Sequence, residues 1–289
     1  MPSPLTIVVN TCDSYADVLS LFFAAFQEYW PSCPYPVVIN SESKKYTCYA
    51  AQTHIYGPPG AKDRWGDRLI TTLNSIDTEF VLMLYDDFVL EERVYDSRIA
   101  EAIDFLSLIK NAAVAYLINT SLKTKSEVTH SRFARVHDTA DYRLNSSPAI
   151  WRRELLIGYT GVIDNPWAWE VFGSYRTYGD GKAFYTLRQG EEDIYKFNRS
   201  KGGAIYRGKW VREVVAGKFE KYHLGIDEAV RGFSADNIYE ARSWMWKAKF
   251  LVLGFRMVGI KSTLFVFSYF RIKLNSVIKA ILASAITKG

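Results

Sequence analysis

The amino-acid sequence predicts an α/β fold in which helices flank a mostly parallel β-sheet. Short apolar, β-branched runs alternate through the first half of the chain with longer runs whose apolar residues recur at helical spacing. Phe80–Tyr85 is a continuous apolar run, which is typical of a strand buried on both faces. The 289 residues are 48% hydrophobic and 23% charged, a composition that excludes a disordered, collagen-like or coiled-coil chain.

The first half of the chain carries the clearest pattern of elements. In chain order we expect a strand, a helix, two short strands, a helix and a buried strand, at Leu5–Val9, Asp17–Tyr29, Pro36–Asn40, His54–Tyr56, Arg64–Ile76 and Phe80–Tyr85. Ligands of such sheets bind beyond the carboxyl ends of the strands. The polar residues Asn10–Ser14 and the pair Asp86–Asp87 follow two of these strands, so we expect a ligand site there.

The second half of the chain is less regular. We expect a helix at Ser97–Leu108, a strand at Ala113–Ile118, and loops with short strands over Gly179–Arg207. A further helix is expected to start near Asn165-Pro166, because Asn is a favourable cap and Pro suits the first helical turn. The polar turn Asn145–Arg153 either lines a binding pocket or connects a strand to a helix.

The last 49 residues, 241–289, carry an unusual charge balance. They contain nine of the 36 basic side chains and none of the 31 acidic ones, so the rest of the chain is mildly acidic. This asymmetry points to a negatively charged partner for the tail. Plotted as a helix, the apolar and cationic residues separate onto different faces, with Val266, Phe267, Phe270, Leu274, Val277, Ile278 and Ile281 on one face and Lys261, Ser268, Arg271, Asn275 and Lys279 on another.

This pattern predicts amphipathic helices that lie in a membrane interface. The longest run without a charge, Ser262–Phe270, is nine residues, whereas a membrane span needs about 20. The alternative is a helical hairpin that packs on the body or on another subunit, as in a homo-oligomer; nucleic acid would make no use of the apolar face. We therefore divide the chain into a catalytic domain, 1–240, with halves at about 1–120 and 121–240, and a membrane-associating tail, 241–289.

Asp86 and Asp87 are the strongest local signal of chemistry. The two carboxylates follow a buried strand and precede another apolar run. Adjacent carboxylates suit a hard divalent cation such as Mg²⁺ or Mn²⁺ that itself binds a diphosphate. The alternative is that both residues cap a turn and bind nearby amides.

Taken together, these features resemble a GT-A glycosyltransferase, nearest in style to the inverting family 2. The resemblance rests on Asn10-Thr11-Cys12-Asp13 after the first strand, on a helix that bears Arg68, and on Tyr85-Asp86-Asp87 in place of an acidic Asp-x-Asp motif. It covers about 90 residues well and about another 120 loosely. One departure is that Tyr85 stands where that motif has its first acid, which puts metal binding in doubt and makes metal-independent transfer an alternative.

The resemblance implies a nucleotide-sugar donor and roles for the matching residues. Asn10, Thr11 and Asp13 would contact the nucleoside, and Arg68 would assist the diphosphate. Asp86 would hold the donor, and Asp87 would hold Mn²⁺ or Mg²⁺. The loop at Tyr206–Trp210 carries two further cations, Arg207 and Lys209, that could close over the diphosphate.

Transfer to a hydroxyl with inversion also needs a general base, which in the resembling family is an acid near the start of a helix. Glu170 is the matching residue, with Trp167 and Trp169 beside it as a platform for an acceptor sugar. Indole rings also lower the local dielectric, which raises the pKa of a carboxylate. The alternative is that both tryptophans are core residues and that Glu170 is an exposed helix residue.

The sequence therefore suggests an inverting glycosyltransferase that acts on a lipid-linked or growing surface glycan, as a peripheral protein on the cytoplasmic side of a membrane. Three cysteines without a disulfide pattern, Cys12, Cys33 and Cys48, agree with a reducing compartment. A phosphate-binding P-loop, a dinucleotide-binding glycine motif and a serine-hydrolase motif are all missing from the sequence. The alternative function is a membrane-peripheral protein that binds nucleotides or glycans without turnover.

Overall fold

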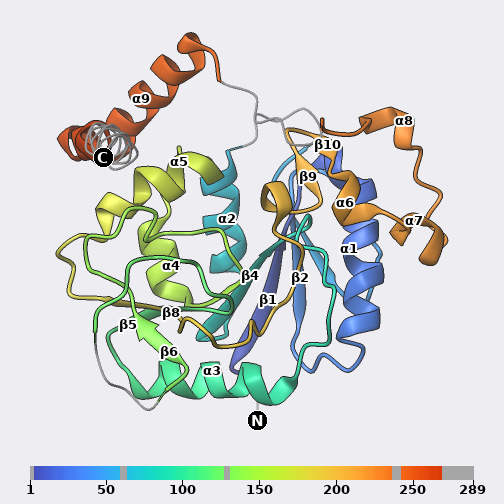
Figure 1. Cartoon of the computed structure of the whole chain (residues 1–289), viewed down its shortest axis with the longest axis horizontal. Coiled ribbons are helices and arrows are strands. Elements are labelled where there is room, and N and C mark those ends of the chain that lie inside the picture. Colours follow the sequence, from blue (N-terminus) through green and yellow to red (C-terminus); the bar gives the residue numbers. More distant parts are fainter. Residues whose placement is uncertain (1–2, 59–63, 127–130, 236–241, 269–289) are drawn as a thin grey trace, which may run out of the picture.

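The computed structural model describes residues 3–58, 64–126, 131–235 and 242–268. Within these residues a single eight-stranded sheet forms the centre of the molecule, with strands in the order β3-β2-β1-β4-β7-β5-β8-β6 (Figure 1). In chain order, β1 to β8 are Leu5–Asn10, Val37–Ser41, Gln52–Ile55, Phe80–Tyr85, Ala112–Tyr116, Phe133–Arg135, Ala149–Arg152 and Ala183–Leu187.

Most of this sheet is parallel. Strands β3, β2, β1 and β4 pair in parallel, and so do β5 and β8. Strand β7 runs antiparallel between β4 and β5, and β6 runs antiparallel at the edge beside β8. The predicted α/β class with a mostly parallel sheet is confirmed. Strands β6 and β7 were not predicted: no element was expected at β6, and β7 lies in the segment interpreted as a polar turn. Strand β8 lies in the segment where loops with short strands were expected.

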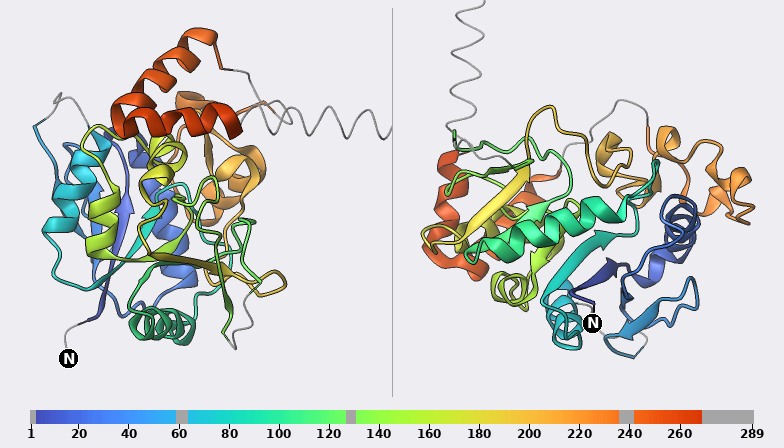
Figure 2. Two further views of the ribbon diagram at one scale, coloured as in Figure 1. Left: turned by 90° about the vertical axis from the view of Figure 1, so that its left-hand side faces the viewer. Right: turned by 90° about the horizontal axis from the view of Figure 1, so that it is seen from below.

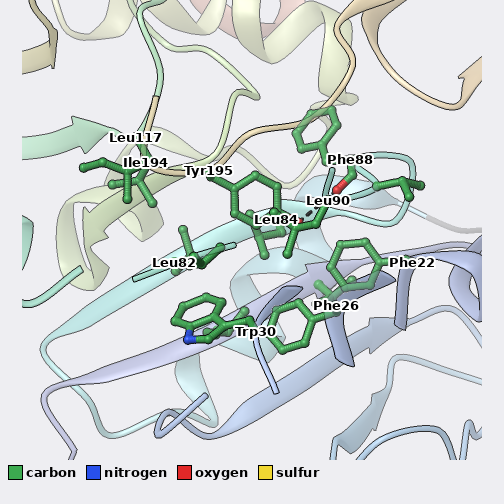
Figure 3. Close-up of a cluster of buried hydrophobic side chains, with 14 of the residues drawn as sticks. Phe22, Phe26, Trp30, Leu82, Leu84, Phe88, Leu90, Leu117, Ile194 and Tyr195 are labelled. Carbon is green, nitrogen blue, oxygen red and sulfur yellow. Dashed lines mark hydrogen bonds between the residues drawn. The ribbon is translucent and has the colours of Figure 1, made fainter. Parts of the chain in front are cut away.

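Helices cover both faces of the sheet, as predicted. Helices α1 (Ala16–Tyr29) and α3 (Asp96–Leu108) pack on one face, and α2 (Trp65–Asn74), α4 (Arg153–Tyr159) and α5 (Pro166–Val171) pack on the other. Strand β4 contributes Leu82 and Leu84 to the first core and Val81 and Met83 to the second, all fully buried. Figure 3 shows Leu82 and Leu84 against the aromatic side chains of α1. The continuous apolar run predicted this two-sided burial.

Short elements gather beyond the carboxyl ends of the parallel strands, around the ends of β1 and β4 (Figure 1). They include the hairpin β9–β10 (Ile205–Tyr206 and Lys209–Trp210) and the 3₁₀ turns η1 (Asp13–Tyr15) and η3 (Ser200–Gly202). The one-turn helices α6 (Arg212–Val215), α7 (Lys218–Lys221) and α8 (Glu228–Arg231) lie on the side of α1 (Figure 1). The 3₁₀ turn η2 (Gly173–Arg176) follows α5. The tail forms helix α9 (Trp244–Val258) and the 3₁₀ turn η4 (Gly259–Ser262), followed by a further helical turn to Ser268.

Helix α9 packs on α5 at one end of the body (Figures 1 and 2). Its inner face, with Phe250 and Leu253, covers the buried ring of Phe172, and the two phenyl centroids lie 4.9 Å apart. Gly254 permits this approach, since a Cβ atom there would lie 2.5 Å from the Phe172 ring. The predicted boundary between residues 240 and 241 lies outside the described residues, as do Phe270, Leu274, Val277, Ile278, Ile281, Arg271, Asn275 and Lys279.

The opposite face of α9 is exposed. It presents Trp244, Val252 and Phe255, which are 77%, 61% and 61% exposed. One helical stretch in the described part of the chain, Trp244–Ser268, is long and apolar enough to cross a membrane by length and composition alone. Its helix is interrupted at Gly259, whose φ of 58° ends α9 before the next turn begins.

Candidate active site

Asp86 and Asp87 directly follow the carboxyl end of β4, in the middle of the sheet. The backbone N–H of Asp86 donates to the carbonyl of Asn10 (3.2 Å), which joins this turn to the end of β1. The Thr11 hydroxyl donates to Oδ2 of Asp86 (2.5 Å), and Asp86 is only 3% exposed. Phe88, which follows Asp87, is fixed by a hydrogen bond that the Tyr195 hydroxyl donates to its carbonyl (2.9 Å), within the cluster shown in Figure 3. The acidic turn is therefore rigidly held.

A cavity of about 820 Å³ opens beside this turn, which is the size of a site for a small organic ligand. Five of the predicted site residues line it, namely Asp86, Asp87, Trp167, Glu170 and Arg207. Three residues of the turn before β7 also line it, Asn145, Ser146 and Ser147. The structure therefore brings the acidic turn, the candidate base and one loop cation to the same cavity.

Glu170 is held in place by its helix and by the turn before β7. Asn165 caps α5 by accepting a hydrogen bond from the Ala168 amide (2.9 Å), and Pro166 occupies the first turn, as predicted. Oε1 of Glu170 accepts a hydrogen bond from the Ser146 amide (2.7 Å). Burial raises the pKa of Glu170, and the hydrogen bond from Ser146 opposes that rise. A carboxylate of raised basicity at a cavity is suited to accept a proton.

The two aspartates are also electrostatically unusual. Burial raises the pKa of Asp87 to about 7. Burial, reinforced by the charge of Asp87, raises the pKa of Asp86 well above its ordinary value, although the hydrogen bond from Thr11 acts in the opposite direction. Such a pair is stabilised as carboxylates when cations or a metal ion approach.

Basic side chains also line the cavity. Arg199, Lys201, Arg207 and Arg242 line it, and each comes from outside the parallel half of the sheet. Arg199 pairs with Asp193 (3.1 Å), and Lys201 and Arg207 both lie 5.5 Å from the centroid of the Tyr206 ring. Four cations around one cavity favour a ligand with several negative charges, such as a diphosphate.

Gly203 lets this basic loop lie directly against Asp87. The Ala204 amide donates to the carbonyl of Asp87 (2.8 Å). Gly203 has φ of 154°, and a Cβ atom there would lie 2.8 Å from the Asp87 carbonyl oxygen and 3.0 Å from Oδ2. A side chain would therefore push the loop away from the carboxylate.

Several predicted site residues hold the site together from outside the cavity lining. Asn10 is 2% exposed and donates to the carbonyl of Leu84 (3.0 Å), and its own Oδ1 accepts from Asn40 (2.8 Å). The guanidinium of Arg68 is buried and donates to the carbonyls of Thr11 (2.6 Å) and Asn40 (2.7 Å). Asn10, Thr11 and Arg68 thus join the ends of β1, β2 and β4.

Three other predicted residues point elsewhere. Asp13 accepts hydrogen bonds from the amides of Ser43 and Lys44 (both 3.1 Å), so its carboxylate orders the loop after β2. Lys209 is exposed on β10 and is not part of the cavity wall. Trp169 has no exposed surface and packs on Trp65 and Trp151, with ring centroids at 5.8 Å, so its predicted acceptor contact is corrected: it is a core residue.

Sequence reasoning missed several residues of the cavity lining, among them Tyr15, Phe197, Arg199, Lys201 and Arg242. The Gly202-Gly203 pair that follows Lys201 is the signal that could have shown a close backbone approach. Arg242 was grouped with the cations of the tail. Nothing local in the sequence marks Tyr15, which reaches the cavity from the turn η1.

The resemblance also implies a divalent cation at Asp87, and the residues fit only part of a site for one. Within the described residues no group of three or more His, Cys, Asp or Glu side chains is placed to hold a metal ion. Mg²⁺ is commonly bound by one or two carboxylates with the remaining positions filled by phosphate and water. The aspartate pair fits a cation that is shared with a bound diphosphate.

A larger hollow of about 1040 Å³ adjoins the cavity and shares Phe197 and Arg199 with it. Its other walls are mainly polar, with Asn119, Thr186 and Gln189 among them. None of the predicted site residues lines it.

No protein-family model and no curated protein sequence matches the chain. Among solved structures, TarS residues 1–349 of S. aureus is similar over 90% of this chain and 82% of that one, at 13% identity and a TM-score of 0.47, and TarS is also known in complex with UDP-GlcNAc. A cytidylyltransferase from Leptospira borgpetersenii is similar over 68% of this chain and 79% of that one, at 10% identity and a TM-score of 0.40. At this identity and with TM-scores below 0.5, these similarities assign no activity.

Proposed function

We propose that the protein is an inverting glycosyltransferase that moves a sugar from a nucleotide-sugar donor to a hydroxyl of a lipid-linked or growing surface glycan. The observation that carries this proposal is the cavity shared by the Asp86–Asp87 turn, four basic side chains and Glu170. The basic side chains can stabilise the departing diphosphate, and the carboxylate of Glu170 can take the proton of the acceptor hydroxyl.

The leaving group is stabilised by positive charge. As the bond between the anomeric carbon and the diphosphate oxygen breaks, the diphosphate gains charge, and Lys201 and Arg207 lie where they can neutralise it. A divalent cation held by Asp87 and the diphosphate would supply additional positive charge. The resemblance and the carboxylate chemistry support this cation.

The acceptor is activated by Glu170. Its carboxylate takes the proton of the acceptor hydroxyl while the oxygen attacks the anomeric carbon from the face opposite the diphosphate, so that the configuration inverts. The Ser146 amide holds one carboxylate oxygen during this step. Trp167 is 57% exposed and lines the same cavity, and its indole face is suited to the C–H surface of an acceptor sugar.

The protein is proposed to work as a peripheral protein on the cytoplasmic side of an anionic membrane. The apolar outer face of α9 is flanked by Lys249 and Arg256 on one side and by Lys247 on the other, which is the arrangement of helices that lie in a membrane interface. No Asp or Glu occurs between Arg242 and Ser268 to repel anionic lipid. Because α9 packs on α5, such docking would bring the cavity close to lipid-linked acceptors.

The test is a transfer assay with purified protein, a panel of nucleotide sugars, and lipid vesicles, with and without Mn²⁺. Asp87→Asn and Glu170→Gln are each expected to lower the rate by about 100-fold or more. Glu154→Gln is the matched control, because that carboxylate is 70% exposed on α4, away from the cavity. Near-normal turnover in either site variant would refute the role assigned to that residue.

The alternative function is binding of nucleotides or glycans without turnover. Tyr85 favours it, because a phenol replaces an acid at the end of β4 and burial raises its pKa, so that it stays uncharged. Binding of donors across the panel, with neither transfer nor hydrolysis, would select this alternative.

A further inference from the structure

Arg242 lies at the cavity although it belongs to the cationic tail. It precedes α9 by two positions, and Ser243 between them caps that helix by accepting a hydrogen bond from the Trp246 amide (3.2 Å). Its guanidinium lies 5.3 Å from the ring centroid of Trp167 on α5 and 4.9 Å from that of Trp246 on α9. Arg242 therefore sits between the candidate catalytic helix and the tail helix.

Two indole rings hold this guanidinium without neutralising it. Arg242 has no acidic partner in the described part of the chain, whereas Arg199 pairs with Asp193 and Arg231 pairs with Asp17. Aromatic faces leave the N–H donors at the edge of a guanidinium available, because they contact its plane. A charged, preorganised donor group at a cavity is suited to an anionic ligand.

The position of Arg242 is fixed through a continuous stack of rings. Trp246 stacks on Phe250 (4.8 Å, 15° between planes), and Phe250 packs on Phe172 (4.9 Å), which follows directly after α5. Glu170 lies on the same short helix as Trp167. The packing of α9 on Phe172 therefore also sets the position of Arg242 at the cavity.

We infer that Arg242 is a phosphate-binding residue that the tail helix delivers to the cavity. The ligand chemistry is an esterified phosphate or diphosphate group, and it has two sources under the proposed function on which this inference rests: the diphosphate of the nucleotide-sugar donor, or the phosphate of a lipid-linked acceptor. In either case a guanidinium donates charge-assisted hydrogen bonds to phosphate oxygens.

The experiment measures binding by the full-length protein, so that it does not depend on turnover. Calorimetric titrations with inorganic pyrophosphate and with UDP probe the donor source, and flotation with neutral phosphatidylcholine vesicles with and without polyprenyl phosphate probes the acceptor source. Arg242→Gln is expected to weaken binding by about tenfold or more in at least one of these arms. Arg242→Lys keeps the charge but loses the planar, forked guanidinium, so its affinity is expected to lie between those of Arg242→Gln and the wild type.

Arg93→Gln is the matched control, because Arg93 is an exposed arginine that also lies over an aromatic ring, that of Tyr95 at 5.8 Å. Weaker pyrophosphate and UDP binding assigns the residue to the donor, and weaker binding only to polyprenyl phosphate assigns it to the acceptor. Unchanged binding in all arms, with thermal unfolding as in the wild type, overturns the inference even if sugar transfer is found. Conversely, if Arg242→Gln loses pyrophosphate binding and the wild-type protein transfers no sugar, Arg242 is a phosphate-binding residue and the proposed function is wrong.

Discussion

Replacing Glu170 by Gln tests the proposed chemistry with little structural disturbance. The carboxylate accepts a hydrogen bond from the Ser146 amide at 2.7 Å, and the amide oxygen of Gln can accept the same bond. Only the ability to take a proton is removed. A positioned general base contributes about 10²- to 10⁴-fold, so kcat for transfer should fall by that factor, equivalent to about 3 to 5 kcal/mol in the barrier.

The same substitution has a predictable effect on stability. Burial raises the pKa of Glu170 in the folded protein above its unfolded value of about 4.3. The folded state therefore binds more protons than the unfolded state between these two values, and the free energy of unfolding falls as pH rises through them. Gln removes this loss, so the variant should unfold at the same or a higher temperature than the wild type at neutral pH.

The assay is transfer rate and thermal unfolding measured from acidic to neutral pH. Wild-type activity should fall as pH drops through the raised pKa of Glu170, and the residual activity of the variant should lack that part of the profile. Asp87, with a pKa of about 7, titrates in both proteins, and the nearby Tyr85, Tyr116 and Tyr142 stay neutral because burial raises their pKa values. A variant that keeps more than about a tenth of the wild-type rate would refute the role of Glu170 as base.

Three further predictions concern the loop, the tail and the membrane. Gly203→Ala should abolish transfer while leaving the fold intact, because its Cβ would lie 3.0 Å from Oδ2 of Asp87; turnover and circular dichroism check this. Gly254→Val should destabilise the protein by about 1 to 3 kcal/mol and release α9 to proteolysis, since even a Cβ there would overlap the ring beneath it; unchanged melting would contradict the packing. Phe255→Glu should reduce binding to anionic vesicles in flotation assays, whereas Leu108→Glu, at a more exposed apolar position of α3, should not; equal loss in both would count against docking through α9.

The sequence predicted the elements whose signal is local. Phe80–Tyr85 is apolar throughout because both faces of β4 are covered, and Asn165 and Pro166 mark the start of α5 by their own chemistry. Strand β7 has only four residues after a polar turn, and it enters the sheet by antiparallel pairing with both β4 and β5. Such pairing depends on segments far away in the sequence, so no local pattern could reveal it.

The two tryptophans beside Glu170 show where helical geometry corrects a sequence motif. Residues two apart on a helix point in directions that differ by about 200°, so Trp167 and Trp169 cannot face the same ligand. The structure places Trp169 in the core and Trp167 at the cavity. Residues three apart share a face, so Trp167 and Glu170 reach the cavity together.

Helix α5 connects the catalytic proposal with the membrane proposal. This one short helix carries Glu170 and Trp167 to the cavity, anchors itself in the core through Trp169, and is followed by Phe172, on which α9 packs. A force on α9 at a membrane surface would therefore act on the helix that carries the proposed base, Glu170. It would also act on Arg242, which α9 holds against Trp167. The tail is thus expected to affect the chemistry as well as the location of the protein, because a side chain from its start completes the basic wall of the cavity.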